Sequence, residues 1–295
     1  MSAVLIGQAE VHSPEWHALR AGGIGGSEIA AVVGLSRWVS AFQLWHIKKG
    51  NLPEQVTKPH MGWGQRLEPV VRDWWAEQHP NLIVDATPGT FAHSERSWQR
   101  VNPDGLIHGL DKDGIPETVA LYEGKISRYG DGFGKSGTDE IPLAYRAQVL
   151  HALDVFDLPR CHVAVLIGGS EAREYVIEAD PTDQHTLRDA GRRFWESLAL
   201  NDEPPIDCSD MTYQAVRDLN PLIEKDALVD LTSEVWGEYL THKSAVRHHE
   251  AELTGVKSRI LAQMGTARSA RYAEMTVLRR QMSSSGTPYL KEVTP

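Results

Sequence analysis

Apolar residues recur along this chain at helical spacing in some segments and at strand spacing in others. The longest helical pattern places five large apolar side chains on one face of a predicted amphipathic helix: Trp63, Leu67, Val70, Val71 and Trp74. Pro69 falls inside this pattern, so it lies either in the first turn of the helix or at a kink.

The segments around this helix alternate in type. Two short helices are predicted at residues 14–19 and 27–34, separated by a glycine-rich turn, with Ser27 as the N-cap of the second. Strands, a helix, a hairpin and a last helix are then predicted at residues 98–107, 119–127, 141–156, 161–167, 173–178 and about 180–200. This order predicts an α/β (α+β) fold in which helices flank a mixed central sheet.

A proline-containing segment predicts where the compact part of the chain ends. Residues 201–210 include two adjacent prolines and are typical of a linker. A long polar helix and a strand-like segment follow at about 231–264 and 273–280. We therefore predict a core domain at 1–200, a linker at 201–230 and a helical and β appendage at 231–295.

Composition narrows the class of protein. Apolar residues make up 41% of the 295 residues and charged residues 24%, which are ordinary values for a globular protein. No segment approaches the roughly 18 apolar residues of a membrane span, and residues 1–10 lack the features of a secretory signal. The two cysteines exclude a disulfide framework and a four-cysteine iron–sulfur cluster. We therefore expect a cytoplasmic protein without a membrane partner.

Charge is distributed unevenly. The net charge is −10, which argues against a protein that coats nucleic acid non-specifically. Residues 241–280 hold eight basic and three acidic side chains, so this segment alone is +5. We interpret it either as a contact for phosphate or an acidic partner, or as a solvated helix face.

Two carboxylates and one ammonium are predicted to converge at one edge of the sheet. Glu123 and Lys125 are two residues apart in a strand, so their side chains project from the same face. Asp104 lies in a turn before a hairpin-like return that can bring it beside Glu123. Carboxylates are preferred ligands of Mg²⁺ and Mn²⁺, and a nearby lysine can orient water or stabilise charge on a phosphate. Glu68, on the predicted helix, is a further candidate carboxylate.

This pattern is specific only when its two motifs are considered together. An isolated Glu-x-Lys usually marks a solvated strand face, and Pro-Asp-Gly alone is a common turn. Their order and spacing here are more specific. On spacing alone, however, both a nuclease site and an ordinary exposed strand remain possible.

Five blocks of sequence, in order, resemble the lambda-exonuclease family, the YqaJ-type viral recombinases of the PD-(D/E)xK nuclease superfamily. They read HALRAGGIGGSEIA, WGQRLE, NPDGL, EGK and PLAYRAQV, at residues 17–30, 63–68, 102–106, 123–125 and 142–149. The resemblance covers about residues 13–180 and implies a core related to restriction endonucleases.

The resemblance implies a role for each residue of the central blocks. Asp104 and Glu123 would ligate the catalytic metals, with the backbone carbonyl of Gly124 as a further ligand. Glu68 would ligate or position the second ion, and Lys125 would position the attacking water. The implied cofactor is Mg²⁺ or Mn²⁺, with two ions per active site.

The first and last blocks would complete the site. By the resemblance, Arg20 and Ser27 hold the 5′-terminal phosphate of the cleaved strand, and Tyr145 and Gln148 line the active site. An arginine beside a glycine-rich turn and a helix N-terminus does suit an anion, and i, i+3 spacing puts Tyr145 and Gln148 on one helix face. The same residues are also typical of a helix cap with a surface ion pair, and of a half-buried helix.

The resemblance therefore implies an exodeoxyribonuclease that digests one strand of linear duplex DNA, 5′ to 3′, and exposes a 3′ single strand for phage-type recombination. It also implies a single-strand-annealing recombinase as partner, a ring-shaped trimer, and a phage- or prophage-encoded protein in the host cytoplasm. One alternative is a structure-specific or restriction-type endonuclease with the same site. Another is an inactive DNA-end-binding recombination scaffold, which the presence of Asp104, Glu123 and Lys125 disfavours.

Histidine and tryptophan invite two further interpretations. His248 and His249 are adjacent, so on a helix they point apart, and a structural zinc site is disfavoured. Trp38 and Trp45 are either core residues or side chains that stack on a base.

Overall fold

The computed structural model describes residues 2–11, 13–54, 59–86 and 89–293, apart from the side chains of 59–61. The chain divides into two compact units, which we call unit 1 (Met1–Ile223) and unit 2 (Glu224–Pro295). Unit 1 continues past residue 200, where we expected the core domain to end. No described helix is long and apolar enough to cross a membrane.

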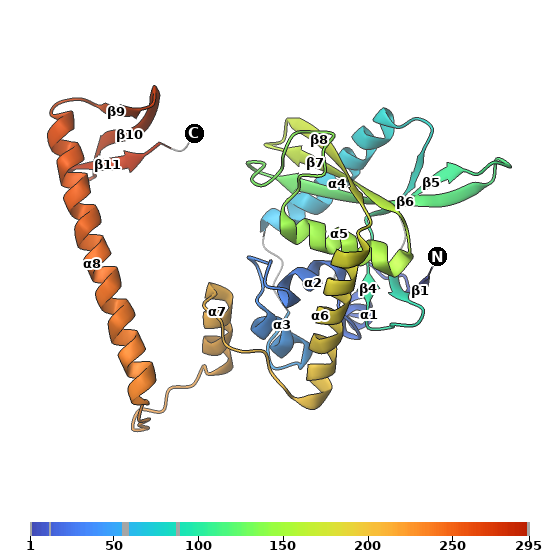
Figure 1. Cartoon of the computed structure of the whole chain (residues 1–295), viewed down its shortest axis with the longest axis horizontal. Coiled ribbons are helices and arrows are strands. Elements are labelled where there is room, and N and C mark those ends of the chain that lie inside the picture. The colour runs from blue at the N-terminus through green and yellow to red at the C-terminus, as the bar shows by residue number, and fades with distance from the viewer. Residues whose placement is uncertain (1, 12, 55–58, 87–88, 294–295) are drawn as a thin grey trace. The chain divides into compact units, whose positions relative to one another are not determined.

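A five-stranded sheet with the order β2-β5-β6-β7-β8 forms the centre of unit 1 (Figure 1). Its strands are β2 (Ile83–Asp85), β5 (Gly105–Leu110), β6 (Pro116–Ser127), β7 (Arg160–Ile167) and β8 (Glu171–Glu178). β6 and β7 are parallel, and the other neighbouring pairs are antiparallel. The parallel pair requires a crossover, which helix α5 (Leu143–Phe156) supplies. These strands and helices confirm the predicted mixed sheet.

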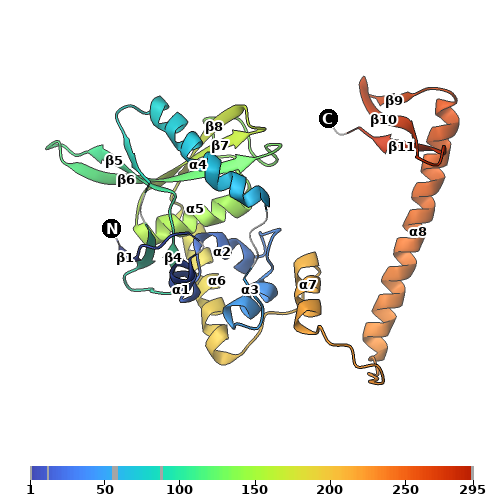
Figure 2. The ribbon, with the colours of Figure 1, turned by 180° about the vertical axis from the view of Figure 1, so that it is seen from behind.

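Alternation along the strands gives each face of the sheet its own core. On one face, Leu121 of β6 and Val163 of β7 pack in the cluster that contains α5. On the opposite face, Tyr122 packs with Trp75 of helix α4 (Pro59–Gln78). Figure 2 shows α4 crossing the strands of the sheet.

Helix α4 confirms the predicted helix and corrects its buried face. The helix begins well before Pro69, which therefore lies in its interior, where the ring removes one helical hydrogen bond. Trp63 and Val70 are 60% and 56% exposed, whereas Val71 and Trp75 are buried. The sequence could not choose between adjacent tryptophans, because either one continues a helical repeat.

The N-terminal part of unit 1 contains three short helices and a second sheet. These elements are α1 (Pro14–Ala21), α2 (Gly26–Val32), α3 (Ala41–Lys48), β1 (Ala3–Gly7), β3 (Thr90–His93) and β4 (Arg100–Val101), with the strand order β1-β3-β4. α2 packs on α5. The turn between α1 and α2 requires glycine, because a Cβ on Gly23 would lie 2.4 Å from the carbonyl oxygen of Trp98.

The last two helices of unit 1 differ in how well the sequence predicts them. Helix α6 (Pro181–Leu200) begins as expected, with Asp180 as its N-cap. Residues 201–230, which we expected to be a linker, contain helix α7 (Asp210–Leu219). Ala215 of α7 is fully buried in a small cluster with α3, so this helix is part of unit 1.

Unit 2 consists of one long helix and a small antiparallel sheet. Its elements are α8 (Ser233–Met264), β9 (Ser269–Tyr272), β10 (Met275–Met282) and β11 (Pro288–Glu292), with the strand order β11-β10-β9. The helix and β10 were predicted, whereas the other two strands were not. The basic side chains of residues 241–280 lie on α8 and on this sheet, apart from Arg268 in the connection between them.

Candidate active site

Strand β6 carries Glu123 and Lys125 on one face of the central sheet. They lie opposite Val163 and Val165 in the parallel register with β7. The Lys125 ammonium donates a hydrogen bond to Glu123 Oε1. Only 16% of the Lys125 side chain and 7% of the Glu123 side chain are exposed. The shared face predicted from the two-residue spacing therefore also contains a shielded ion pair.

The β5–β6 hairpin brings Asp104 to the same strand. Asp104 lies in the bend before β5, and Gly105 at the start of β5 pairs with Tyr122. The backbone N–H of Gly124 donates to Asp104 Oδ2 at 2.9 Å. This hydrogen bond ties the aspartate to the strand that carries the glutamate and the lysine.

Helix α4 places Glu68 against the same part of β6. A Cβ on Gly124 would lie 3.6 Å from Glu68 Cγ and 3.4 Å from Tyr122 Oη, so both side chains border this position of β6. The Tyr122 hydroxyl is buried, and no described residue forms a hydrogen bond with it. The site therefore contains an unpaired hydroxyl beside its carboxylates.

Helix α5 contributes the two residues that were expected to line the site. Gln148 Nε2 donates a hydrogen bond to Glu123 Oε1. Lys125 Nζ lies 5.0 Å from the centre of the Tyr145 ring, a distance at which the ring attracts a cation. Both side chains contact the charged groups, and their roles in a reaction stay predictions.

The carboxylates carry more negative charge than Lys125 neutralises. Burial and the charge of Asp104 raise the pKa of Glu68 to about 7, and the same two causes raise the pKa of Glu123 to about 7. Burial also raises the pKa of Asp104. Burial opposes protonation of Lys125, but Glu123 and Asp104 outweigh it and raise the pKa of the lysine.

The chemistry of these side chains suits a hard divalent cation. Oxygen ligands are those that Mg²⁺ and Mn²⁺ prefer, and a cation would offset the burial of the carboxylates and the repulsion of Glu68 and Glu123 by Asp104. The side chains are not arranged around an ion, because no three His, Cys, Asp or Glu among the described residues are grouped as a metal site. Glu123 Oε1 instead accepts hydrogen bonds from Lys125 and Gln148, which metal binding would have to replace.

A second group of polar side chains surrounds Arg20. Its Nη2 lies 3.3 Å from Ser27 Oγ and 3.7 Å from Glu28 Oε1, and its guanidinium carbon is 4.6 Å from the Trp16 ring centre. Lys48 Nζ donates to the Arg20 carbonyl at 3.2 Å and pairs with Glu28 at 2.9 Å. These contacts position Arg20, and Ser27 is exposed beside it.

Ser27 does not cap α2, in contrast to the prediction. Gly25 is the N-cap residue, and its backbone N–H donates to Glu28 Oε2 at 2.7 Å. The helix therefore starts earlier than the serine, because a glutamate three residues after the cap satisfies the cap N–H. Ser27 lies in the first turn, where its hydroxyl contacts Arg20.

Gln148 connects the two groups. A Cβ on Gly26 would lie 3.3 Å from Gln148 Cγ, so the start of α2 packs on the side chain that bonds to Glu123. The group around Arg20 is therefore a near neighbour of the carboxylates.

Three residues of these groups were missed by the sequence analysis. Glu28 had a usable signal, its capping-box spacing from Gly25. Lys48 had none, because its ion pair joins separate helices. Tyr122 had none either, because alternation assigns it to the opposite face of β6 from Glu123.

Burial decides the interpretation of Trp45 but not that of Trp38. Trp45 is 4% exposed and donates to Ser197 Oγ at 3.2 Å, so it is a core residue. Trp38 is 50% exposed beneath Arg37, so base stacking stays a hypothesis for it. His248 and His249 lie on the surface of α8, and neither belongs to a metal site among the described residues.

Residues 15–158 match the family model described as the YqaJ-like viral recombinase domain. Over this range the chain is similar to the YqaJ-like viral recombinases. The matched range contains every candidate site residue, from Arg20 to Gln148. The uncharacterized protein YqaJ of Bacillus subtilis (strain 168) is 26% identical over 271 residues, which are 90% of this chain and 82% of that protein.

The fold of this chain is similar to that of LHK-Exo, an alkaline exonuclease from Laribacter hongkongensis. The crystal structure of LHK-Exo in complex with dAMP is 18% identical with a TM-score of 0.50, and a second LHK-Exo structure is 17% identical with the same score. Each match covers 64% of this chain and 94% of LHK-Exo. At this identity the similarity shows the fold alone.

Proposed function

We propose that this chain is a metal-dependent exodeoxyribonuclease that digests linear duplex DNA from an end. The observation that carries the proposal is the cluster of Asp104, Glu123, Lys125 and Glu68, in which three carboxylates share one ammonium inside a YqaJ-like domain. The similarity in fold to an alkaline exonuclease supports the same class of reaction.

Asp104, Glu123 and Glu68, with the backbone carbonyl of Gly124, would hold two Mg²⁺ or Mn²⁺ ions. When bound, these ions supply Lewis-acid stabilisation of the scissile phosphate and lower the pKa of water. The Gly124 N–H orients Asp104, and Gln148 orients Glu123. These bonds hold Asp104 and Glu123 on β6, and metal binding would replace the hydrogen bonds to Glu123 Oε1.

Lys125 contributes a positive charge and a hydrogen-bond donor. Because its pKa is raised, it stays protonated near neutral pH and does not act as a base. The ammonium that now bonds to Glu123 would donate to the attacking water or to a phosphate oxygen. The nearby Tyr145 ring limits where the ammonium can go.

Arg20 and Ser27 would give digestion its direction. A guanidinium and a hydroxyl at the start of α2 suit a terminal phosphate, since the helix N-terminus also favours an anion. The contacts from Trp16, Glu28 and Lys48 hold Arg20 for this purpose. A 5′-phosphate bound there would present the 5′-ended strand and leave a 3′ single strand.

We further propose that this 3′ strand serves phage-type recombination in the cytoplasm, with a single-strand-annealing recombinase as partner and a ring trimer as the assembly. The YqaJ-like viral recombinase domain supports the recombination setting. The basic segment 241–280 would add phosphate contacts, each worth about 0.9 in the logarithmic salt dependence of binding.

The test is a gel assay of linear duplexes labelled at either end, beside covalently closed circles. We expect linear DNA to be shortened from its 5′ ends with Mg²⁺, circles to stay intact, and excess EDTA to stop the reaction. Rapid nicking of circles would favour the endonuclease. Tight binding of ends without cleavage would favour the inactive scaffold.

The direction is tested with the same duplexes after removal of the 5′ phosphate. We expect slower digestion of the dephosphorylated ends, and Arg20→Ala should abolish the difference between the two substrates. Arg193→Ala, which changes an exposed arginine of α6, is the matched control and should retain the difference. A preference that survives in Arg20→Ala would remove Arg20 from the phosphate site.

A further inference from the structure

Helix α8 is long and almost entirely exposed. It contains 32 residues, about 48 Å at the usual rise, and Met264 at its end is its buried residue. Most helices in proteins are stabilised by packing an apolar face, because local propensity alone is marginal in water. The large apolar side chains of α8 therefore predict a partner for this helix.

These side chains follow a strict heptad repeat. Seven positions, spaced alternately four and three residues apart, form one stripe: Val235, Tyr239, His242, Val246, His249, Leu253 and Val256. The five apolar members are between 39% and 57% exposed. A repeat of this period keeps one stripe facing a second helix along its whole length, as in a coiled coil.

The face of α8 opposite the stripe has small residues along its centre, with the exposed Leu240 beside them. The outermost heptad positions are occupied by small side chains or none: Gly237, Ser244, Ala251 and Ser258. Most of the large apolar surface therefore lies on one side, which is typical of a helix that pairs with one other helix.

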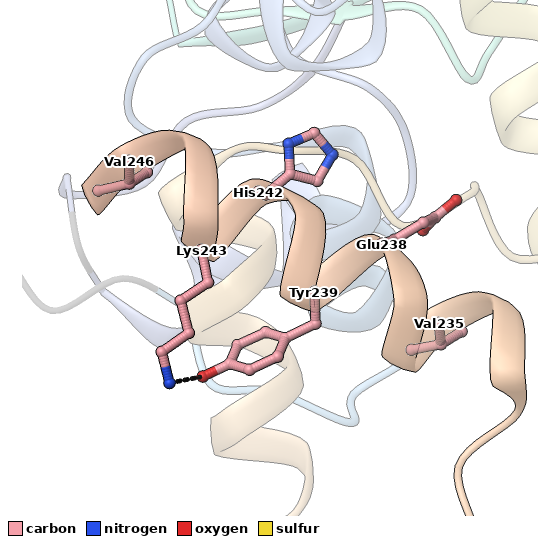
Figure 3. A pocket seen from close by; sticks show the side chains of 6 residues that line it. All are labelled: Val235, Glu238, Tyr239, His242, Lys243 and Val246. Atoms are coloured by element: carbon pink, nitrogen blue, oxygen red, sulfur yellow. Dashed lines mark hydrogen bonds between the residues drawn. The ribbon is translucent and has the colours of Figure 1, made fainter. Parts of the chain in front are cut away.

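The first part of the stripe is hollowed. Val235, Tyr239, His242 and Val246 line a shallow depression of about 520 Å³ together with the flanking Glu238 and Lys243 (Figure 3). Lys243 Nζ lies 3.4 Å from the Tyr239 hydroxyl at its border. A depression lined by stripe residues and their charged neighbours is the kind of surface that accepts the side chains of a facing helix.

The charges beside the stripe are complementary to those of an identical helix. In a parallel pair, Glu238 would meet Lys243 of the second copy, and Glu252 would meet Lys257. In an antiparallel pair with the stripes overlapped, Glu238 would meet Arg259 and Lys243 would meet Glu250. Both arrangements join opposite charges at these flanking positions.

We infer that α8 forms a two-stranded coiled coil with α8 of a second copy of this chain. The stripe itself contains no lysine or arginine, so it is unsuited to phosphate, and the basic residues of α8 lie outside it. The self-complementary flanks favour an identical helix over an unrelated one. The interface and the candidate active site consist of different residues, and the inference does not depend on the proposed nuclease function.

The first test compares two double variants of the full chain by light scattering. Val246→Lys with Leu253→Lys places two charges in the stripe, and Ser244→Lys with Ala251→Lys adds the same charges on the outer face. We expect the control to keep the mass of the wild type and the stripe variant to fall to half of it. A wild type that stays at the 32.8 kDa of one chain, or two variants of equal mass, would overturn the inference.

The second test is a gain of association, which misfolding of a variant does not imitate. His242→Leu with His249→Leu removes the two polar residues of the stripe, and Thr241→Leu with His248→Leu adds leucines beside it. We expect the stripe variant to associate at least tenfold more tightly in sedimentation equilibrium, and the control to resemble the wild type. Equal tightening in both would show adhesion of added leucine without a heptad interface and would overturn the inference.

Discussion

Two clusters of shielded charged side chains lie at opposite ends of helix α5. Positive charges outnumber negative ones in the first cluster, and negative charges outnumber positive ones in the second. Near its last turn, Asp154 is 9% exposed and accepts hydrogen bonds from Gln99 at 2.8 Å, Arg188 at 3.0 Å and Arg96 at 3.3 Å. Burial alone would raise the pKa of Asp154, but the bonds from Arg188 and Gln99 and the two arginine charges lower it.

The cluster at the other end of α5 has the reverse balance. There, Lys125 is shared by Glu123, Asp104 and Glu68, and the pKa of each carboxyl group is raised. The Asp154 cluster is complete without any further ion and joins three segments of unit 1. The Glu123 cluster is deficient in positive charge, so it is the one suited to bind a cation.

The largest expected difference between the two clusters is in the turnover of DNA. Asp104→Asn keeps an oxygen that can accept the Gly124 N–H but removes a negative charge from the proposed metal site. We expect cleavage of linear DNA to fall about a thousandfold or more, while the free energy of unfolding stays unchanged or rises slightly. Single-turnover assays and urea denaturation measure the two quantities. Near-normal turnover in Asp104→Asn would mean that the site is misplaced.

Lys125→Met should have the next largest effect. It keeps the length of the side chain but removes the one ammonium of the cluster. We expect kcat to fall about a hundredfold with little change in DNA affinity, because the charge acts in the transition state. Binding measured by fluorescence anisotropy in Ca²⁺ separates the two. Weaker binding with unchanged kcat would make Lys125 a phosphate anchor.

Asp154→Asn, the same chemical change at the other cluster, should leave turnover intact and lower stability. It removes a charge that two arginines neutralise, and both arginine side chains are partly exposed, so we expect a loss of about 2 kcal/mol. The free energy of unfolding in urea measures it. A variant of normal stability and abolished cleavage would remove the distinction between the two clusters.

The smallest expected effect is the pH dependence of the stability that Asp154→Asn loses. The pKa of Asp154 is lowered in the folded chain, so its stabilisation is fully present above the unfolded value of about 3.9 and disappears as pH falls through the folded value. The difference in stability between wild type and Asp154→Asn should therefore be constant from pH 7 to 5 and shrink on further acidification. Urea denaturation at several pH values tests this, and a difference that grows in acid would contradict it.

The sequence predicted that Asp104, Glu123 and Lys125 lie together, but it gave no prediction of the cluster around Asp154. Strand alternation was sufficient to place Glu123 and Lys125 together, and a hairpin was sufficient to bring in Asp104. Both are local relations that a sequence pattern carries. The partners of Asp154 come from separate segments of the chain, so their meeting depends on how helices pack.

The same dependence on contacts between distant segments explains the errors in the predicted fold. Periodicity identified helix α4 but not which of Trp74 and Trp75 faces the sheet, since that is decided by contact with β6. Helix α7 was missed because prolines before it suggested a linker, whereas its burial against α3 is a tertiary contact. Ser27 was placed at a cap because a serine suits that position, although the Gly25–Glu28 pair takes it.

The connectivity of β6 has a consequence for the order in which the chain acquires its active site. β5 and β6 are joined by residues 111–115, whereas β6 and β7 are separated by residues 128–159. Closing a short loop costs less entropy, so we expect the β5–β6 hairpin to form first and the α5 crossover later. A nascent chain would then hold Asp104 beside Gly124 before Gln148 reaches Glu123. Pulse-labelled hydrogen exchange during refolding should protect the amides of β5 before those of β7.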